Sequence, residues 1–174
     1  RPLVHVLVVE DSEDDYHLLL LQLRKAPFSV QSERIETLAE LRRTLVQRAW
    51  DVVISDHNLP GFTSTDALNE VKQLSPDSPF IILSGAIGED AAVVAMQNGA
   101  DDYVMKHRPH RLVPAIERAL RNASERRERR LAEQAVFMAN RRLKAISANI
   151  PGLILRLTWD PETANLGLAY SSGG

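Results

Sequence analysis

Five polar side chains stand directly behind four short apolar segments of the sequence, and their types suit one shared site. They are Glu10 and Asp11 after the first segment, Asp56 after another, and Ser84 and Lys106 after two more. Three crowded carboxylates repel one another and raise one another's pKa unless a cation lies among them. Mg²⁺, or Mn²⁺ in its place, prefers oxygen ligands, and Mg²⁺ is often shared with a phosphate. The set therefore predicts a divalent cation and a phosphate at one place in the fold.

Asp56 is the candidate nucleophile of this site. An aspartate carboxylate can attack phosphorus and hold the product as an acyl phosphate. The Lys106 ammonium would neutralise charge on the transferring group, and the Ser84 hydroxyl would donate a hydrogen bond to a phosphoryl oxygen. The residue types thus predict phosphoryl transfer to Asp56.

Each of these side chains, taken alone, has an ordinary structural explanation. Acidic residues after a strand often form turns or cap helices, and for Asp14 and Asp15 we favour that interpretation. Ser84 precedes a glycine, as in many turns, and a single lysine such as Lys106 often faces solvent. The placement of the whole set behind four different apolar segments is what favours a functional site.

Short apolar segments alternate with segments of helical periodicity along the first two-thirds of the chain. The expected strands cover residues 3–9, 30–35, 52–55, 80–83 and 103–105, and the expected helices cover 14–25, 38–48, 66–74, 89–98 and a segment from about 111 onward. Proline and glycine fall where elements should end, at Pro27, Pro60, Gly61, Pro76, Pro79 and Gly99. Alternation of this kind predicts a doubly wound α/β fold with a five-stranded parallel sheet. Ligands of such folds bind beyond the carboxyl ends of the strands.

Four segments together resemble the receiver domain of bacterial response regulators. They are VLVVEDSEDD, VVISDHNLPG, IILSG and NGADDYVMK. The resemblance covers about the first two-thirds of the chain. It implies a flavodoxin-like sheet with strand order 2-1-3-4-5. It also implies that Asp56 accepts a phosphoryl group from a cognate histidine kinase or phosphotransfer protein in a two-component phosphorelay.

The resemblance also implies roles for particular residues. Asp11 and Asp56 would bind Mg²⁺ directly, Glu10 would assist, and the backbone carbonyl of Asn58 would complete the protein ligands of the metal. Ser84 and Tyr103 would form a switch pair, in which the serine moves toward the phosphoryl group and the tyrosine ring turns inward. Tyr103 has an alternative interpretation as an aromatic residue that closes the sheet edge.

The sequence departs from the family pattern just after Lys106. In many receiver domains a proline follows the lysine directly, in a cis peptide bond that shapes the loop. Here His107 and Arg108 follow, and Pro109 comes later. The role that the resemblance implies for the lysine does not depend on this difference.

Residues 124–150 are expected to form an extended signalling helix, because neither glycine nor proline occurs between Pro114 and Pro151. The stretch RNASERRERRLAEQ interleaves glutamate with arginine, which is typical of a solvated helix face rather than a nucleic-acid patch. Apolar residues then follow a coiled-coil spacing at Ala132, Val136, Ala139, Leu143, Ile146 and Ile150. A competing seam passes through Leu131, Ala135, Met138 and Ala145. We therefore expect a coiled-coil linker and a homodimer through this helix, with the register left open.

The final residues, 151–174, read as two short strands around a turn, LILRLTWD and LAYSSGG. The segment ANIPGLILRLTWDPETANLGLAYSSGG is similar to the opening of a PAS sensor domain. We accordingly divide the chain into a receiver domain at 1–123, the linker at 124–150 and a truncated PAS-like start at 151–174. The segment itself is not expected to be an enzyme. A longer parent protein could carry a histidine kinase or diguanylate cyclase output.

Composition excludes several other classes. The net charge of −2 offers no global attraction to nucleic acid or to an anionic membrane, and no helix-turn-helix signature follows the arginine run. Cysteine is absent, so disulfides and thiolate metal sites are excluded. No apolar run approaches the ~20 residues of a membrane helix, and the amino-terminal residues lack the features of a signal peptide. We expect a cytoplasmic protein with no direct nucleic-acid or membrane partner.

Three other functions are alternatives to the phosphoacceptor. A pseudo-receiver would only mediate protein contacts, although the acidic set and Lys106 are complete. A phosphohydrolase with an aspartyl nucleophile usually needs a second acid close behind it, and DHNLP supplies none. A flavin domain needs a phosphate cradle after the first strand, where EDSEDD would repel a phosphate. His57, the one histidine beside the site, is expected to face solvent.

Overall fold

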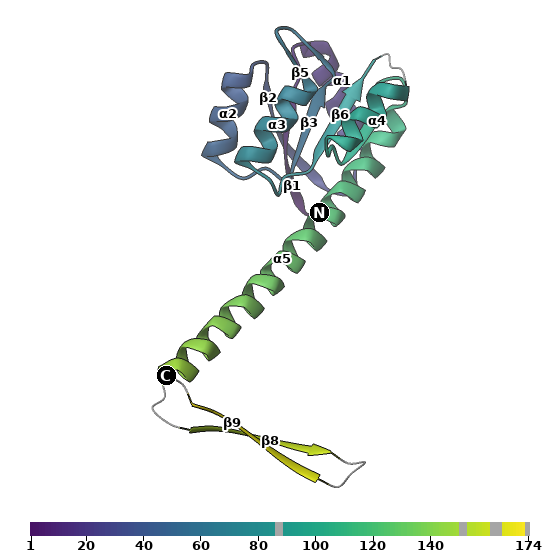
Figure 1. Cartoon of the computed structure of the whole chain (residues 1–174). Coiled ribbons are helices and arrows are strands. Elements are labelled where there is room, and N and C mark those ends of the chain that lie inside the picture. The colour runs from purple at the N-terminus through teal and green to yellow at the C-terminus, as the bar shows by residue number, and fades with distance from the viewer. Residues whose placement is uncertain (86–88, 150–152, 161–164, 173–174) are drawn as a thin grey trace. The chain divides into compact units, whose positions relative to one another are not determined.

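The computed structural model describes the chain except for residues 86–88, 150–152, 161–164 and 173–174, and it describes side chains for residues 1–85 and 92–145. The chain divides into two units, Arg1–Arg127 and Glu128–Gly174, and each is described by itself below. The first unit alternates strands with helices from its first strand to the start of a long helix (Figure 1).

The elements of the first unit follow the predicted order closely. They are β1 (Leu3–Val9), α1 (Glu13–Leu23), β2 (Ser29–Ile35), α2 (Leu38–Gln47), β3 (Val52–Asp56), β4 (Asn58–Leu59), β5 (Phe62–Thr63), α3 (Ser64–Leu74), β6 (Phe80–Ser84), α4 (Glu89–Gln97), β7 (Asp102–Met105), the 3₁₀ turn η1 (Pro109–Arg111) and α5 (Leu112–Asn149), which continues into the second unit. The five predicted strands are β1, β2, β3, β6 and β7.

The central sheet has the order β2-β1-β3-β6-β7, and all neighbouring strands are parallel. This confirms the predicted order 2-1-3-4-5 and the doubly wound α/β class. The register pairs Asp56 with Leu83 and pairs Ser84 with Met105. Parallel strands end at the same edge of a sheet, so the residues behind β1, β3, β6 and β7 meet at the carboxyl edge.

Helices cover both faces of this sheet, and each face has its own apolar core. On one face α1 and the first turns of α5 pack on the sheet, and Leu19, Leu23 and Ile116 are buried there. On the other face α2, α3 and α4 pack on the strands, and Leu41 and Leu68 are buried there. Strands covered on both faces are apolar at nearly every position, which explains the continuous apolar segments of the sequence.

Side-chain caps set where the helices begin. Ser12 caps α1, and its hydroxyl accepts a hydrogen bond from the backbone N–H of Asp15. Thr63 and Asp66 form a reciprocal capping box at the start of α3. Such caps satisfy backbone N–H groups that have no partner inside the helix. The cap at Ser12 fixes the helix start immediately behind the acidic pair Glu10 and Asp11.

The connection from β3 to α3 contains a small hairpin that the sequence did not predict. β4 and β5 pair antiparallel, with Leu59 opposite Phe62, and the turn between them uses Gly61 at φ +86°. Glycine accepts a positive φ without the steric cost that other residues have. Pro60 and Gly61 were predicted as a turn, but two-residue strands are too short to show a periodicity.

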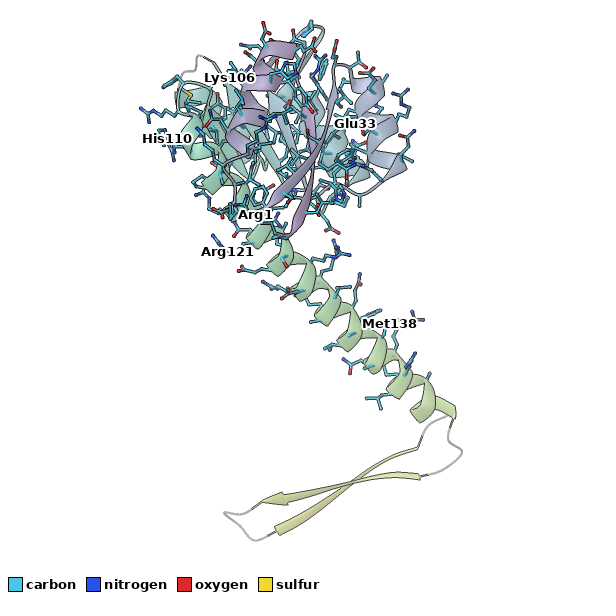
Figure 2. All side chains as sticks on the ribbon, turned by 180° about the vertical axis from the view of Figure 1, so that it is seen from behind. Arg1, Glu33, Lys106, His110, Arg121 and Met138 are labelled. Atoms are coloured by element: carbon cyan, nitrogen blue, oxygen red, sulfur yellow. The ribbon has the colours of Figure 1, made fainter. Side chains whose placement is uncertain are left out.

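The second unit contains the later part of α5 and two antiparallel strands, β8 (Leu153–Asp160) and β9 (Asn165–Ser172). The two predicted strands are therefore present. On α5 the large apolar residues Leu131, Val136, Phe137, Met138 and Leu143 are each more than half exposed. Figure 2 labels Met138, whose side chain projects from this stretch of helix. Two further residues of the first predicted seam, Ile146 and Ile150, have side chains outside the described residues. Among the described helices, none combines the length and the apolar character that a membrane crossing requires.

Candidate functional site

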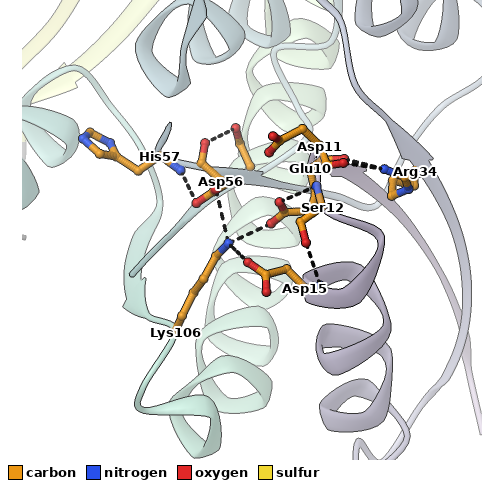
Figure 3. A network of polar contacts seen from close by, with 9 residues as sticks. Glu10, Asp11, Ser12, Asp15, Arg34, Asp56, His57 and Lys106 are labelled. Atoms are coloured by element: carbon orange, nitrogen blue, oxygen red, sulfur yellow. Dashed lines mark hydrogen bonds and ion pairs between the residues drawn. The ribbon is translucent and has the colours of Figure 1, made fainter. Parts of the chain in front are cut away.

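Three carboxylates meet at the carboxyl edge of the sheet (Figure 3). Glu10 follows β1 and is 3% exposed, Asp56 ends β3 and is 8% exposed, and Asp11 is open to solvent. Each offers one carboxylate oxygen, and these three oxygens lie within 4.8 Å of one another. The structure thus brings together the three acids that the sequence placed behind two different strands.

Lys106 joins this cluster from the end of β7. Its Nζ lies 2.9 Å from Glu10 Oε2, 3.2 Å from Asp56 Oδ2 and 2.5 Å from Asp15 Oδ2. The backbone N–H of Lys106 donates to the carbonyl of Ser84, 2.7 Å away, which ties the end of β7 to the end of β6. One ammonium therefore contacts three carboxylates from three parts of the fold, the loop after β1, the first turn of α1 and the end of β3.

The pKa values of Glu10 and Lys106 show how closely this cluster is coupled. Burial raises the pKa of Glu10, and the negative charge of Asp56 raises it further, while hydrogen bonds from Lys106 and from the Ser12 backbone oppose the rise. Burial alone would lower the pKa of Lys106, but hydrogen bonds to Asp15 and Glu10 and the charges of Glu10 and Asp56 outweigh it and raise that pKa. Lys106 is therefore fully charged at neutral pH.

Asp15 is a site residue that the sequence interpretation missed. We read Asp14 and Asp15 as turn or cap formers, whereas the Asp15 side chain contacts Lys106 Nζ. Ser12 is the cap itself, so Asp15 occupies the third helical position behind it. One feature of the sequence could have indicated the role of Asp15. A capping serine, Ser12, follows the acidic pair directly, so the first helical turn, which contains Asp15, must begin beside the site.

Arg34 is a second residue that the sequence interpretation missed. Its guanidinium donates to the backbone carbonyls of Glu10 and Asp11, at 3.1 and 3.2 Å, and pairs with the Glu36 carboxylate at 2.8 Å. Arg34 lies near the end of β2, at a position where the sequence predicted a strand and no role in the site. The loop that carries the acidic pair is thus held from the neighbouring strand.

The surroundings of Asp56 hold its carboxylate in place. The backbone N–H of His57 donates to Asp56 Oδ1 at 2.7 Å, and the Ser55 hydroxyl donates to the Asp56 carbonyl at 2.9 Å. We expected the His57 ring to face solvent. That expectation was wrong, because the ring is half-buried and its Nδ1 lies 3.1 Å from the hydroxyl of the buried Ser64. His57 stabilises the start of α3 and does not contact Lys106 (Figure 3).

Ser84 and Tyr103 each bury a hydroxyl group. Neither hydroxyl has a hydrogen-bond partner among the described residues. Burial raises the pKa of Tyr103, and the neighbouring Ser84 hydroxyl offsets part of this rise, although the two groups do not meet in a well-formed hydrogen bond. A buried hydroxyl without a partner costs free energy, so a hydrogen-bond partner for either group would be favourable.

The remaining predicted residues lie in the loops around the site. Asn58 is exposed and begins β4, two residues after Asp56, and its role as a carbonyl ligand remains a prediction. Behind Lys106 the chain turns through a hydrogen bond from Arg108 N–H to the Met105 carbonyl and enters η1 at Pro109. Lys106 contacts the acids even though His107, and not proline, follows it in this chain.

The arrangement combines four chemical capabilities. Asp56 provides an anionic oxygen, and Glu10 and Asp11 add oxygen ligands that suit a hard divalent cation. Lys106 provides a fixed positive charge beside Asp56, and Ser84 provides a buried hydroxyl that has no partner within the described part of the chain. A nucleophile flanked by cationic and hydroxyl groups can accept a phosphoryl group and stabilise its charge.

Solved structures of receiver domains share this fold. A response regulator receiver domain protein from Clostridium thermocellum is 28% identical, and the match covers 70% of this chain and 97% of that one with a TM-score of 0.60. The beryllofluoride-activated NtrC4 receiver domain dimer is 26% identical, with coverage of 68% and 98% and a TM-score of 0.61.

Curated relatives are similar over the same part of the chain. The regulatory protein LuxO of Vibrio cholerae is 31% identical over 100 residues, which are 57% of this chain and 22% of LuxO. The DNA-binding transcriptional regulator NtrC of Escherichia coli is 33% identical over 128 residues, which are 72% of this chain and 26% of NtrC. The chain therefore spans about a quarter of the length of these two relatives.

The response regulator receiver domain family matches residues 6–117. This range contains β2, β3, β6, β7 and all but the first three residues of β1, together with the three clustered acids, Ser84, Tyr103 and Lys106. The match covers more than half of the chain, and the fold and the acidic edge agree with it, so the chain belongs to the response regulator receiver domain family.

Proposed function

We propose that this chain is a phosphoacceptor receiver in a two-component phosphorelay, with Asp56 as the residue that is phosphorylated. The observation that carries this proposal is the contact between Lys106 Nζ and Asp56 Oδ2, within a cluster that includes Glu10 and Asp11. The phosphoryl donor would be a phosphohistidine of a cognate histidine kinase or phosphotransfer protein.

The transfer is a displacement at phosphorus. A carboxylate oxygen of Asp56 forms a bond to phosphorus, and the bond between phosphorus and the donor's histidine nitrogen breaks, with its electron pair remaining on nitrogen. Charge develops on the equatorial oxygens during this displacement. Lys106 contacts the Asp56 carboxylate and is held charged by its neighbours, so it can pair with one of these oxygens.

The carboxylates of Glu10, Asp11 and Asp56 suit a divalent cation, because their oxygens converge within 4.8 Å and hard cations bind such oxygens. Asp11 and Asp56 would bind it directly, with Glu10 and the Asn58 carbonyl assisting. Mg²⁺ or Mn²⁺, when bound, would neutralise charge on the carboxylates and on the phosphoryl oxygens.

Ser84 and Tyr103 would change conformation in response to phosphorylation of Asp56. Both hydroxyls are buried and unpaired among the described residues. A phosphoryl oxygen on Asp56 would offer Ser84 an acceptor, and the movement of Ser84 would change the space beside the Tyr103 ring. Such a pair biases a two-state equilibrium rather than creating a new state.

The long helix α5 would carry this bias onward. We propose that its exposed apolar residues form a parallel coiled coil with a second copy, and that β8 and β9 open a PAS-like domain that leads to an output module. A solvated helix with a large apolar seam is typical of dimerisation. The NtrC4 receiver relative is described as a dimer in its beryllofluoride-activated form.

Phosphorylation with acetyl phosphate and Mg²⁺ tests the central proposal. The wild-type chain should gain one phosphoryl group by intact mass spectrometry, and Asp56→Asn should gain none. Asp51→Asn is the matched control, because Asp51 is an exposed aspartate just before the opposite end of the same strand. Phosphorylation of Asp56→Asn at the wild-type level would overturn the assignment.

Two of the alternative functions predict different experimental results. A pseudo-receiver would leave the wild-type mass unchanged under all donor concentrations. A phosphohydrolase would release phosphate repeatedly from a phosphoester such as p-nitrophenyl phosphate. The receiver assignment predicts a single phosphoryl group on the protein and no turnover of that ester beyond the Asp56→Asn background.

A further inference from the structure

The Lys106 ammonium has as many carboxylate partners as it has N–H donors. A lysine ammonium carries three such donors. Its Nζ contacts Glu10 at 2.9 Å, Asp56 at 3.2 Å and Asp15 at 2.5 Å. A phosphoryl oxygen that is to contact Lys106 must therefore take the place of one of these three carboxylates.

The three partners are not equally exchangeable. The side chains of Glu10 and Asp56 are 4% and 10% exposed, and both belong to the carboxylate cluster that suits a cation. Asp15 is 38% exposed and lies outside that cluster. A solvent-accessible carboxylate loses less when its ion pair breaks, because water replaces the lost partner. Asp15 is accordingly the partner that can leave.

The position of Asp15 on α1 also allows it to leave without a large penalty. Asp15 lies in the first turn of the helix, and its backbone N–H is held by the Ser12 cap. An anionic side chain near a helix amino terminus is stabilised by the backbone N–H groups and the helix dipole there. The helix thus supports the Asp15 charge whether or not Lys106 is beside it.

We propose that Asp15 is a positioning residue that competes with the phosphoryl group for Lys106. This rests on the proposed function at Asp56. In the unphosphorylated chain Asp15 holds the lysine within the carboxylate cluster. Phosphorylation requires Lys106 to turn from Asp15 to a phosphoryl oxygen, and loss of the aspartyl phosphate lets the pair form again.

Asp15 therefore lowers the affinity of the site for a phosphoryl group in two ways. It occupies one N–H donor of Lys106, and its own negative charge repels an anionic donor. Asp15→Asn removes the negative charge, and its neutral amide oxygen is a weaker acceptor for Lys106 than a carboxylate, so both effects become smaller. A half-exposed ion pair of this kind corresponds to a change in affinity of about three- to tenfold.

Binding of beryllofluoride, an unreactive phosphoryl mimic, measures this competition without turnover. Each variant is titrated at saturating Mg²⁺ and followed by the amide NMR signals of the residues around Asp56. Asp15→Asn should bind the mimic about three- to tenfold more tightly than the wild-type chain. Asp15→Glu should return the affinity toward the wild-type value, because it restores a carboxylate.

Asp14→Asn is the matched control. Asp14 is the adjacent exposed aspartate in the same helical turn, and the change removes the same charge without touching a partner of Lys106. Equal affinities of Asp14→Asn and Asp15→Asn would overturn the inference, because the effect would then be general charge. If Asp15→Asn does not fold, Asp15→Ser replaces it in the same comparison.

The same titration separates this inference from the function on which it rests. A wild-type chain that shows no binding of beryllofluoride overturns the phosphoacceptor assignment and this inference with it. Wild-type binding that Asp56→Asn abolishes, together with no difference between Asp14→Asn and Asp15→Asn, overturns the role of Asp15 alone.

Discussion

The ammonium of Lys106 lies 3.2 Å from Oδ2 of Asp56, although Lys106 follows β7 and Asp56 ends β3, and these two strands are not neighbours in the sheet. β6 separates β3 from β7, so the lysine reaches across the end of an intervening strand. The long, flexible side chain of lysine makes this contact possible. It places a fixed positive charge beside the carboxylate that would attack phosphorus.

Replacement of Lys106 by methionine should slow phosphorylation of Asp56 strongly. Methionine keeps most of the side-chain volume and removes the charge that would pair with the phosphoryl oxygens. Loss of one preorganised group of this kind lowers a rate by about a hundredfold. The rate of mass gain with acetyl phosphate and Mg²⁺ checks this, with Lys25→Met as a control at a lysine exposed on the surface beyond α1. Equal rates in Lys106→Met and the wild type would contradict the role of Lys106.

The pH dependence of stability should also depend on Lys106. Its pKa is raised above the ordinary 10.5, so the folded state holds this proton more tightly than the unfolded state does. The resulting stabilisation is fully present below pH 10.5 and is lost as pH rises through the higher pKa of the folded state. Lys106→Met should therefore unfold more readily than the wild type at pH 7, by about 1–3 kcal/mol.

Urea unfolding at a series of pH values checks this prediction. The difference in unfolding free energy between wild type and Lys106→Met should be constant between pH 7 and pH 9 and should shrink above pH 10.5. A difference that grows with rising pH would have the wrong sign for a lysine that is stabilised by its carboxylate neighbours.

The sheet and the acidic edge could be predicted because their signals are repeated along the chain. Buried parallel strands have continuous apolar sequences, and the residues that follow these strands must meet at the carboxyl edge of the sheet. This rule alone predicts that three residues, Glu10, Asp56 and Lys106, lie at the site. The order of the strands needed the resemblance to a known family, because periodicity alone does not say which strands are neighbours.

Asp15 and Arg34 could not be assigned from the sequence because each has a sufficient local explanation. An aspartate in the first turn of a helix is common near a cap, and an arginine on an alternating strand reads as a solvent-facing residue. Their site contacts depend on side-chain direction across the space between elements. The same holds for His57, whose ring turns toward Ser64 rather than toward solvent.

Arg34 is predicted to order the loop that carries the acidic pair. Its guanidinium donates to two backbone carbonyls, those of Glu10 and Asp11. Arg34→Ala should lower the unfolding free energy by about 1–2 kcal/mol and speed hydrogen exchange at the amides of residues 11–15. Arg24→Ala, at an exposed arginine behind α1, should leave exchange in that loop unchanged. Unchanged exchange in Arg34→Ala would show that the loop holds its shape without it.

The coiled-coil proposal forecasts which face of α5 meets a second copy. In a coiled coil the seam residues are spaced alternately four and three residues apart. The seam through Val136 and Leu143 has an apolar residue at each such position from Ala132 to Ile150. The competing seam through Leu131 and Met138 would include Arg142 at its next position. Charged residues inside a dimer seam cost stability unless they are paired. We therefore predict that the first seam forms the interface.

Two double variants with the same charge change test this forecast. Val136→Lys with Leu143→Lys should weaken dimerisation on the order of a hundredfold, because each places an unpaired ammonium in the seam. Leu131→Lys with Met138→Lys makes two similarly exposed positions basic and should leave the dimer intact. Sedimentation equilibrium measures both, and a monomer from the second variant but not from the first would assign the interface to the other seam.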